Sequence, residues 1–292
     1  MREVEAKSIL ATSNGMWFGM DYNMNLYRGC CHGCIYCDSR SDCYQVEDFD
    51  SVRVKKDALK ILNRELSSKR KKGVIGIGAM SDSYNPFEKE EEVTRGALKL
   101  IEHYGFGISL ETKSDLIIRD IDLFKKIQAK NNLILKMTIT CAEDALSKII
   151  EPNVCVSSKR FEAIKQLSEA GLFCGVLLTP VLPYITDSLE NMRAMVKKSA
   201  ENGAKFILSM YGVTLRANQR EYYYEQLDKH FPNLSFHYRQ VYRNNYVCNI
   251  PDQKRWIREF EQECKKYGLL YKMNDIVKAY KKEKDIKQLS LF

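Results

Sequence analysis

The sequence predicts an α/β fold with the architecture of an open, partial (β/α)6 barrel. Strand-like apolar runs alternate with amphipathic helical stretches of about 10–15 residues, an alternation typical of a parallel sheet. Six such units are recognisable, which is too few for a closed barrel of eight strands. A cysteine-rich loop follows the first run, where the carboxyl ends of parallel strands meet and where barrel enzymes hold their sites.

The six strands are expected at 17–26, 74–80, 106–111, 133–140, 172–179 and 205–210, because each of these runs is apolar. The fifth run is stopped by Pro180, which cannot continue a ladder. Amphipathic helices are expected between the strands and after the last one, at 56–72, 90–103, 115–129, 159–170, 188–202 and 218–229. Gly171 stands directly after the fourth helix, as a C′ glycine does.

The alternation divides the chain into four parts. An N-terminal segment, 1–16, precedes the barrel, which we place at 17–230. From Phe231 the alternation stops, and an aromatic, polar stretch and a helix at 252–267 form a C-terminal helical extension, 231–277. The segment 278–292 is a charged tail that ends in three large apolar residues.

Composition limits the classes of protein to consider. The 292 residues suffice for one large α/β domain or two small ones. No signal peptide and no apolar stretch of membrane-spanning length is visible, so a cytoplasmic protein is expected. Ten cysteines without an export signal indicate a reducing compartment rather than a disulfide framework. The formal net charge of +8 favours an acidic partner such as nucleic acid.

Three cysteines of the loop after the first strand indicate a metal cluster. Cys30, Cys34 and Cys37 have the spacing C-x3-C-x2-C, with the aromatic residue Tyr36 just before the third cysteine. Three thiolates can bind three irons of a [4Fe–4S] cluster and leave the fourth iron for a small molecule. An open position marks a catalytic metal site, whereas an electron-carrying cluster normally has four cysteine ligands.

Two simpler sites are the alternatives. Cys31, Cys34 and Cys37 also begin a ferredoxin-like run, but Ser41 and Asp42 stand where that run requires Cys-Pro. A zinc site could recruit His32 and Cys43, but no second ligand pair with finger-like spacing follows.

Polar residues follow the second and third strands, where a ligand in the barrel mouth would lie. Ser81 and Asp82 come after the second strand, and Lys113 comes after the third. Lys113 can meet a carboxylate as a point charge. The competing interpretation for the serines in this region, Ser114 included, is that they cap the helices that follow.

The sequence resembles the radical S-adenosylmethionine (SAM) superfamily, and within it the branch that is similar to spore photoproduct lyase. The matching residues are Asn25 to Cys30, His32 to Cys37, the loop from Ser81 to Glu88, Thr112-Lys113, Glu151-Pro152, Arg160, Pro180, Pro183 and Thr186-Asp187. This resemblance covers about residues 20–211. It implies the partial barrel, a [4Fe–4S] cluster on Cys30, Cys34 and Cys37, and SAM on the open iron.

The same resemblance implies roles for particular residues. It places Ser81 and Lys113 against SAM, with Tyr36 and Asp82 as further cofactor-binding candidates. It also implies a reaction in which one electron from the cluster, delivered by a donor such as flavodoxin or ferredoxin, cleaves SAM and releases a 5′-deoxyadenosyl radical.

One departure from the lyases concerns the return of a hydrogen atom. The lyases carry a cysteine in a Cys-Thr-Ser-Asp run, but this chain has Ala79-Met80-Ser81-Asp82. Spore photoproduct cleavage is therefore in doubt. Cys141, just past the fourth strand, is a candidate hydrogen donor, and a structural thiol is the equal alternative.

The last five residues resemble the motif that docks DNA polymerases and repair proteins onto the bacterial sliding clamp. They are Gln288-Leu289-Ser290-Leu291-Phe292, after a highly charged approach. We expect Gln288, Leu289, Leu291 and Phe292 to contact the clamp, since large apolar side chains on a charged tail need a surface to insert into. A tail that packs on its own core is the alternative.

Together these features predict a radical SAM enzyme that acts on DNA, repairs or modifies a base and is recruited by the sliding clamp. The first alternative is a radical SAM enzyme that modifies RNA or a peptide, with a merely structural tail. The second is a DNA-bound redox sensor, which the ligand-binding residues at the strand ends argue against.

Overall fold

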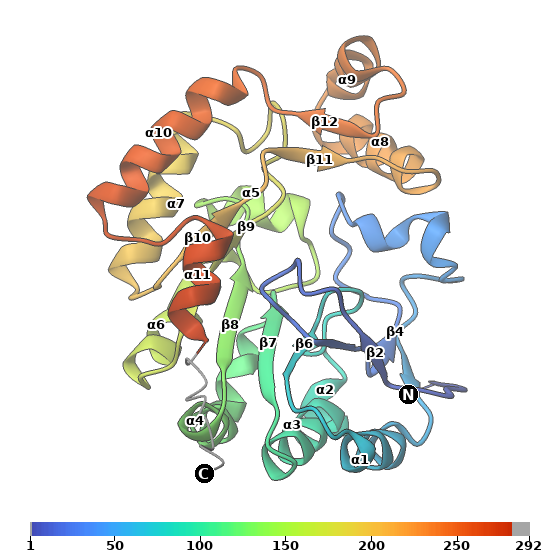
Figure 1. The fold of residues 1–292 in the computed structure, drawn as a ribbon. Helices are drawn as coiled ribbons and strands as arrows, with labels where there is room; N and C mark the ends of the chain where they lie inside the picture. The colour runs from blue at the N-terminus through green and yellow to red at the C-terminus, as the bar shows by residue number, and fades with distance from the viewer. Residues whose placement is uncertain (1, 282–292) are drawn as a thin grey trace.

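The computed structural model describes residues 2–281, and they form an open barrel around one main sheet (Figure 1). The strand order in this sheet is β10-β9-β8-β7-β6-β3-β2. All neighbours from β3 to β10 are parallel, and β2 (Leu10–Thr12) pairs antiparallel with β3 at the edge. The motif residues Gln288, Leu289, Leu291 and Phe292 lie outside the described residues.

The six parallel strands coincide with the six that the sequence predicts, so the α/β partial-barrel prediction is confirmed. They are β3 (Tyr22–Met24), β6 (Val74–Ile77), β7 (Gly107–Thr112), β8 (Leu133–Thr138), β9 (Cys174–Leu178) and β10 (Ile207–Ser209). Except for β7, which is as long as its predicted run, each strand is shorter than the apolar run that predicts it.

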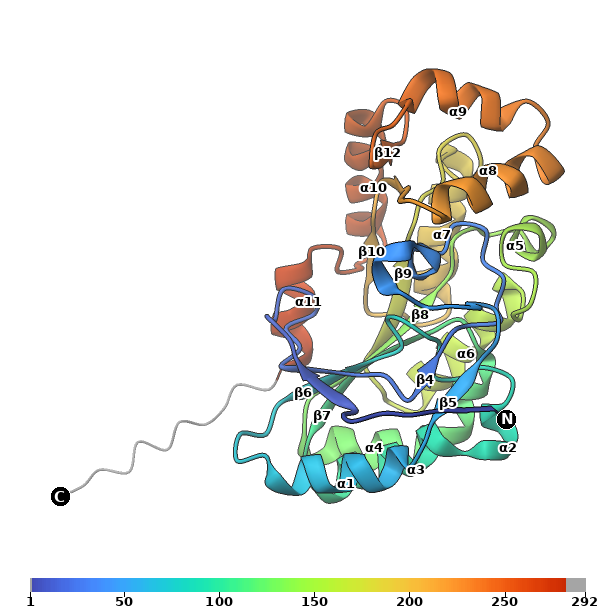
Figure 2. The same cartoon turned by 90° about the vertical axis from the view of Figure 1, so that its right-hand side faces the viewer.

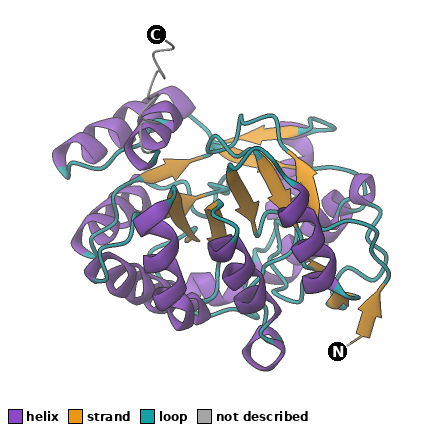
Figure 3. Ribbon diagram, turned by 60° about the horizontal axis from the view of Figure 1, so that its bottom comes forward, coloured by secondary structure: helices purple, strands orange, loops and turns teal. Residues whose placement is uncertain are grey.

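Helices cover the outer face of the sheet (Figure 3). The helices that connect the strands are α1 (Ala58–Ser68), α2 (Glu88–Glu91), α3 (Val93–His103), α4 (Ile121–Lys130), α5 (Asp144–Ile150), α6 (Ser157–Glu169) and α7 (Leu189–Glu201). Helix α8 (Gln219–His230) lies above the barrel, and its buried side chains pack in a separate cluster with Tyr238. The prediction misses the short helix α5. It also merges α4 with the 3₁₀ helix η3 (Asp115–Asp120), at whose start the Ser114 hydroxyl accepts a hydrogen bond from Leu116 N.

The alternation of side chains along each strand gives the sheet an apolar outer face and an interior face that is partly polar. On β8, Leu133, Leu135 and Met137 pack in the main core with the helices. Ile134 lies on the other face, in a second cluster with Phe18 and Phe206. Because successive side chains of a strand point to opposite faces, the interior also receives polar side chains from the same strands.

Short elements near the barrel mouth frame the cysteine loop. One small sheet joins β1 (Arg2–Val4), β5 (Arg53–Lys55) and β4 (Tyr27–Arg28), and the last of these leads directly into the loop. The loop continues into the 3₁₀ helices η1 (Asp38–Arg40) and η2 (Asp42–Tyr44). Two antiparallel strands, β11 (Gly212–Thr214) and β12 (Val247–Asn249), lie above the barrel beside α8 and α9 (Leu234–Tyr242).

The C-terminal extension contains two further helices, α10 (Gln253–Lys266) and α11 (Met273–Tyr280). Helix α11 runs past the start of the predicted tail at 278. Tyr280 is buried and donates a hydrogen bond to the Phe18 carbonyl at 2.6 Å, and Ile276 packs in the same cluster as Phe206. Figure 2 shows α11 and α10 on one side of the molecule and α5 on the other. No helix among the described residues has the length and apolarity that crossing a membrane requires.

Candidate active site at the carboxyl ends of the strands

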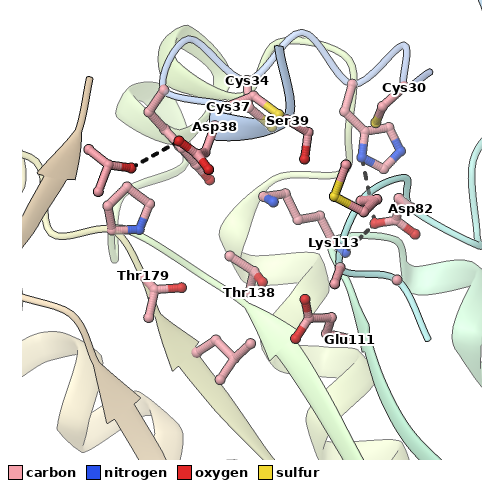
Figure 4. Close-up of a pocket in the computed structure, with 18 of the residues that line it drawn as sticks. Cys30, Cys34, Cys37, Asp38, Ser39, Asp82, Glu111, Lys113, Thr138 and Thr179 are labelled. Atoms are coloured by element: carbon pink, nitrogen blue, oxygen red, sulfur yellow. Dashed lines mark hydrogen bonds and ion pairs between the residues drawn. The ribbon is translucent and has the colours of Figure 1, made fainter. Parts of the chain in front are cut away.

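A cavity of about 550 Å³ opens at the carboxyl ends of the strands (Figure 4). This volume lies within the range of about 300–1,000 Å³ that is typical of small-molecule sites. The cavity brings together the predicted residues Cys30, Cys34, Cys37, Tyr36, Ser81, Asp82 and Lys113.

The cysteine loop is tied to two neighbouring segments by backbone hydrogen bonds. Cys30 N donates to Phe49 O at 2.8 Å, and Ile35 N donates to Ile150 O at 3.0 Å. Gly29 has a φ of +81°, and a Cβ on it would lie 2.5 Å from the Ser51 carbonyl oxygen. Only glycine fits this close approach, so residue 29 fixes how the chain enters the loop.

The segment after α5 holds the other side of the loop. Asn153 N donates to the His32 carbonyl at 3.1 Å, and the Asn153 side-chain amide donates to the Cys31 carbonyl at 2.9 Å. The loop is thus held in place before any cofactor binds.

Cys30, Cys34 and Cys37 line the cavity, whereas Cys31 packs against the main core. Burial, with the charge of Asp82, raises the pKa of the Cys30 thiol to about 12, and burial raises the pKa of Cys37. The thiols are therefore protonated in the metal-free chain, and a metal must displace those protons when it binds.

The donor set suits a cluster of several irons. Three thiols from one loop face one roomy cavity, so each can bind a different metal atom (Figure 4). Within residues 2–281, no three His, Cys, Asp or Glu side chains are placed to hold a single ion. Cys43, which the zinc alternative would recruit, instead meets Arg216 Nη1 at 2.8 Å and does not line the cavity.

Asp82 joins the cysteine loop to the strand ends. Its carboxylate accepts hydrogen bonds from the Thr112 hydroxyl at 2.6 Å and from Lys113 N at 2.8 Å. His32 Nδ1 lies 3.6 Å from the same carboxylate. With all these contacts made to protein groups, Asp82 acts mainly to position the loop and the ends of β6 and β7.

Lys113 is the cation of the cavity. Its ammonium lies 5.7 Å from the centre of the Tyr36 ring and has no hydrogen-bond or ion-pair partner among the described residues. Burial favours the neutral amine, but the negative charges of Cys34 in its thiolate form and of the Glu151 carboxylate outweigh burial and raise the pKa of Lys113. A protonated, unpaired ammonium in a cavity is suited to a carboxylate ligand.

A buried network supports the aromatic residue of the cysteine motif. The Glu151 carboxylate accepts hydrogen bonds from the Tyr36 hydroxyl and from the Arg160 guanidinium, and all three groups are buried. Arg160 also donates to the Thr138 carbonyl at 3.0 Å. Burial alone would raise the pKa of Glu151, but Arg160 and Lys113 outweigh burial and lower it. Tyr36 is therefore locked against the cavity by a charged pair behind it.

Ser81 is buried, lines the cavity and donates its hydroxyl hydrogen to the Gly29 carbonyl. The turn before it depends on Gly78, which has a φ of +101° and on which a Cβ would lie 2.0 Å from the Glu111 carbonyl oxygen. The Ser81 side chain thus contacts the entry to the cysteine loop. Its hydroxyl oxygen can still accept a hydrogen bond from a ligand.

Two features of the cavity escape the sequence analysis. At the floor, the Glu111 carboxylate accepts hydrogen bonds from Lys136 Nζ at 3.0 Å and from Trp17 Nε1 at 3.3 Å. Burial lowers the pKa of Lys136, which has Glu111 as its counter-charge. The sequence pattern that could have revealed this ion pair is Lys136, a lysine inside the otherwise apolar strand Leu133–Thr138.

At the mouth, the Arg216 guanidinium lies between two aromatic rings, 5.5 Å from the centre of the Tyr44 ring and 5.1 Å from that of Tyr246. Both tyrosines line the cavity. These three residues are far apart in the sequence and meet only through the β11–β12 pair, so no local pattern reveals them.

Cys141 is not brought to the cavity. It is fully buried in a cluster with Ile35 and Leu182, and its thiol points to the Glu143 carbonyl at 3.5 Å. Its location favours the structural role, and hydrogen donation by Cys141 stays a prediction without support from geometry.

The comparisons with known proteins agree with this site. The sequence model of the radical SAM superfamily matches residues 24–196. An uncharacterized protein of Mycobacterium tuberculosis is 28% identical over 265 residues, which cover 88% of this chain and 77% of the relative. An uncharacterized protein of Methanocaldococcus jannaschii is 37% identical over 171 residues, 58% of this chain and 63% of that protein.

Solved structures share the fold. Spore photoproduct lyase complexed with dinucleoside spore photoproduct has a TM-score of 0.66 at 14% identity, covering 92% of this chain and 81% of that one. A mutant of this lyase with bound AdoMet and the same dinucleoside has a TM-score of 0.67 over 92% and 80% at 14% identity. A radical S-adenosylmethionine methyltransferase from Kitasatospora setae has a TM-score of 0.55 at 12% identity, covering 82% and 51%.

Proposed function

The chain belongs to the radical SAM superfamily, and on this premise we propose that it repairs or modifies a base of DNA. It is an enzyme whose cofactors are a [4Fe–4S] cluster and SAM. When bound, these cofactors supply the chemistry: one-electron reduction cleaves SAM and yields methionine and a 5′-deoxyadenosyl radical.

The residues of the cavity have separable tasks in this proposal. Cys30, Cys34 and Cys37 hold the cluster as thiolates. Lys113 binds the carboxylate of SAM with its unpaired ammonium, since a charged hydrogen bond in a partly buried site is strong. Asp82 and Tyr36 keep the loop and Lys113 in place through the contacts described above.

The mouth of the cavity supports a nucleic-acid substrate. Tyr246 is exposed and Tyr44 and Arg216 are half-buried, and the two rings lie around the guanidinium, which also pairs with Asp38 at 3.3 Å. Nucleobases stack on aromatic and guanidinium planes, and phosphates pair with arginine. The net charge of +8 acts in the same direction at longer range. The fold is one that spore photoproduct lyase shares, and the mouth of the cavity thus carries side chains suited to bind a base.

The reaction on the base differs from that of the lyases in one respect. Ala79 and Met80 line the cavity where the lyases have their cysteine. Apart from the three cluster cysteines, no thiol is found among the cavity-lining residues of the described chain. A substrate that needs no thiol hydrogen donor fits this arrangement better than spore photoproduct does.

The DNA proposal is tested by comparing nucleosides from cells with and without an active enzyme. Genomic DNA from wild-type cells and from a Cys34→Ala strain is digested and compared by mass spectrometry, with total RNA as a parallel sample. We expect a nucleoside that differs in DNA only. A nucleoside that differs only in RNA would contradict DNA as the substrate, and so would the absence of any difference in both nucleic acids.

We further propose that the last five residues, Gln288–Phe292, bind the sliding clamp. The described chain ends at Lys281, beside Gly19 and the buried Tyr280, at the amino-terminal end of the strands.

The clamp proposal is tested with purified clamp. We expect micromolar binding, about −8 kcal/mol, because burial of Leu291 and Phe292 contributes about 1.5–3 kcal/mol each. Deleting Gln288–Phe292 should abolish binding and leave SAM cleavage unchanged. Equal clamp binding by the full chain and the truncated chain would refute the proposal.

A further inference from the structure

The floor of the candidate active site carries a charged pair that the proposed function leaves unused. Lys136 is fully buried, and its ammonium donates to Glu111 Oε2 at 3.0 Å and lies 4.4 Å from the centre of the Phe18 ring. Glu111 lines the cavity, and its side chain is 17% exposed. Apolar residues of similar size often stabilise a fold as well as a buried ion pair does, so stability alone gives little reason for this pair.

The pair presents one carboxylate oxygen to the cavity. Glu111 Oε2 accepts hydrogen bonds from Lys136 and from Trp17 Nε1, whereas no described residue donates to the other oxygen, Oε1. Two donors hold Oε2, so the carboxylate is fixed and Oε1 stays available to a ligand. A carboxylate accepts hydrogen bonds and donates none, and the ligand must therefore supply an N–H or an O–H group.

A flat ring and a hydroxyl accompany this oxygen. Trp17 is half-buried and lines the cavity, and its hydrogen bond to Glu111 fixes the indole relative to the carboxylate. The register pairs Glu111 with Lys136, so Thr138, which also lines the cavity, stands diagonally across from Glu111 on β8. A ring to stack on, a hydrogen-bond acceptor and a hydroxyl suit a planar heterocycle that carries an N–H group.

The position of these groups in the cavity favours the substrate over the cofactors. Figure 4 shows Glu111 and Thr138 on the side of Lys113 that faces away from the cysteine loop. The cysteine loop and Lys113 are the groups to which the proposed function assigns the cluster and the carboxylate of SAM. The floor is therefore left for the molecule on which the radical acts. Enzymes that react with a base take it out of the stack and read its edge by hydrogen bonds in such a pocket.

From this geometry we propose that Glu111 selects a base that carries an exocyclic amino group, which donates a hydrogen bond to Oε1 while the ring stacks on Trp17. Adenine, cytosine and guanine have such a group, and carboxylates accept hydrogen bonds from the amino group of cytosine in protein–DNA complexes. Thymine has none. A carbonyl oxygen in place of the amino group would set two acceptors against each other, which disfavours binding. This inference rests on the proposed action on DNA.

The test measures, by fluorescence anisotropy, how tightly the reconstituted full-length enzyme binds short single-stranded DNA in the presence of SAM and without a reductant. Each strand is an oligothymidine with one central base replaced by adenine, cytosine or guanine, or by the counterpart that lacks the amino group. Uracil is the counterpart of cytosine, and hypoxanthine is that of both purines. The variants are Glu111→Gln and the double variant Glu111→Gln/Lys136→Met, with Glu169→Gln at an exposed position of α6 as the control.

We expect the wild-type enzyme to bind one amino-bearing strand about ten- to a hundredfold more tightly than its counterpart, the range for a hydrogen bond to a charged group. Glu111→Gln should remove most of this preference, because an amide can turn either its oxygen or its amino group toward the base. The double variant should behave in the same way without leaving a buried ammonium unpaired, so it serves if the single variant does not fold. Glu169→Gln should keep the preference, and SAM affinity should be that of the wild type in all variants.

Three results would overturn the inference and leave DNA as the substrate. One is equal binding of all strands by the wild-type enzyme, and another is a preference that survives in both Glu111 variants. The third is a loss of SAM affinity in both Glu111 variants, which would make the carboxylate a ligand of SAM. A wild-type enzyme that binds none of the strands would instead contradict the proposed action on DNA, and the inference with it.

Discussion

At the scale of single residues, the position of Lys113 in the cavity gives the strongest support for SAM as a ligand. The sequence placed it after the third strand, and the structure turns its ammonium into the cavity beside Tyr36 without a partner. Sequence reasoning succeeded here because strand ends in a parallel sheet gather at one edge. It could not foresee that Glu151 would add to the negative charge around the ammonium.

Replacing Lys113 with alanine should weaken SAM binding by roughly ten- to a hundredfold, because a lost hydrogen bond to a charged group is worth about 1.5–3 kcal/mol. The iron content should remain that of the wild type. Equilibrium binding of SAM to the reconstituted proteins measures the effect, with exposed Lys126→Ala on α4 as the control. SAM affinity that is the same in both variants would remove Lys113 from the site.

Glu151 is the buried counter-charge of Arg160, and its replacement should be costly. Glu151→Gln keeps the shape of the side chain but leaves Arg160 without an anion, so a loss of about 3–5 kcal/mol in the free energy of unfolding is expected. Denaturant titrations of both proteins at pH 7 measure it. A loss below about 1 kcal/mol would mean that the ion pair contributes little net stability.

The same pair predicts a pH dependence. Since the folded-state pKa of Glu151 is lowered, its stabilising effect is present above the ordinary glutamate pKa of about 4.3 and is lost as the pH falls through the lower folded value. The difference in stability between wild type and Glu151→Gln should therefore shrink only below about pH 4.3. A difference that disappears already near neutral pH would contradict the assignment.

At the scale of elements, the six strands were predictable because each is a buried apolar run between turn residues. The misses have physical causes. Helix α5 spans only Asp144–Ile150, too short for its period to stand out. Helix α11 spans only Met273–Tyr280 and runs directly into the lysine-rich tail, so its two buried side chains, Ile276 and Tyr280, form too short a pattern to stand out.

Helix α11 should contribute to the stability of the fold. The residues after α11 should not be needed for that stability. A chain ending at residue 272 loses the burial of Ile276 and Tyr280, each worth about 1.5–3 kcal/mol, and uncovers Phe18. A chain ending at 281 keeps all of these contacts. Thermal unfolding should show a clearly lower Tm for the first truncation and a Tm near that of the full chain for the second. Equal Tm values for the two truncations would contradict the packing role of α11.

At the scale of the whole molecule, the sequence located one side of the site and missed the other. The cysteine motif and the strand-end residues are local patterns, and the structure brings them into one cavity. The mouth is built by Arg216, which follows β11, and by Tyr246 from the C-terminal extension, and both reach Tyr44. Contacts between distant segments depend on tertiary packing, and no periodicity or spacing records them.

The proposed function depends on a cluster that is held by Cys30, Cys34 and Cys37 and that makes SAM cleavable. The decisive measurement is anaerobic reconstitution with iron and sulfide, followed by iron analysis and quantification of 5′-deoxyadenosine after addition of SAM and dithionite. We predict about four irons per chain and 5′-deoxyadenosine formation for the wild type and for Cys31→Ala. Both should be lost in Cys30→Ala, Cys34→Ala and Cys37→Ala. Wild-type protein that forms no 5′-deoxyadenosine, or activity that needs Cys31 and not Cys30, would contradict it.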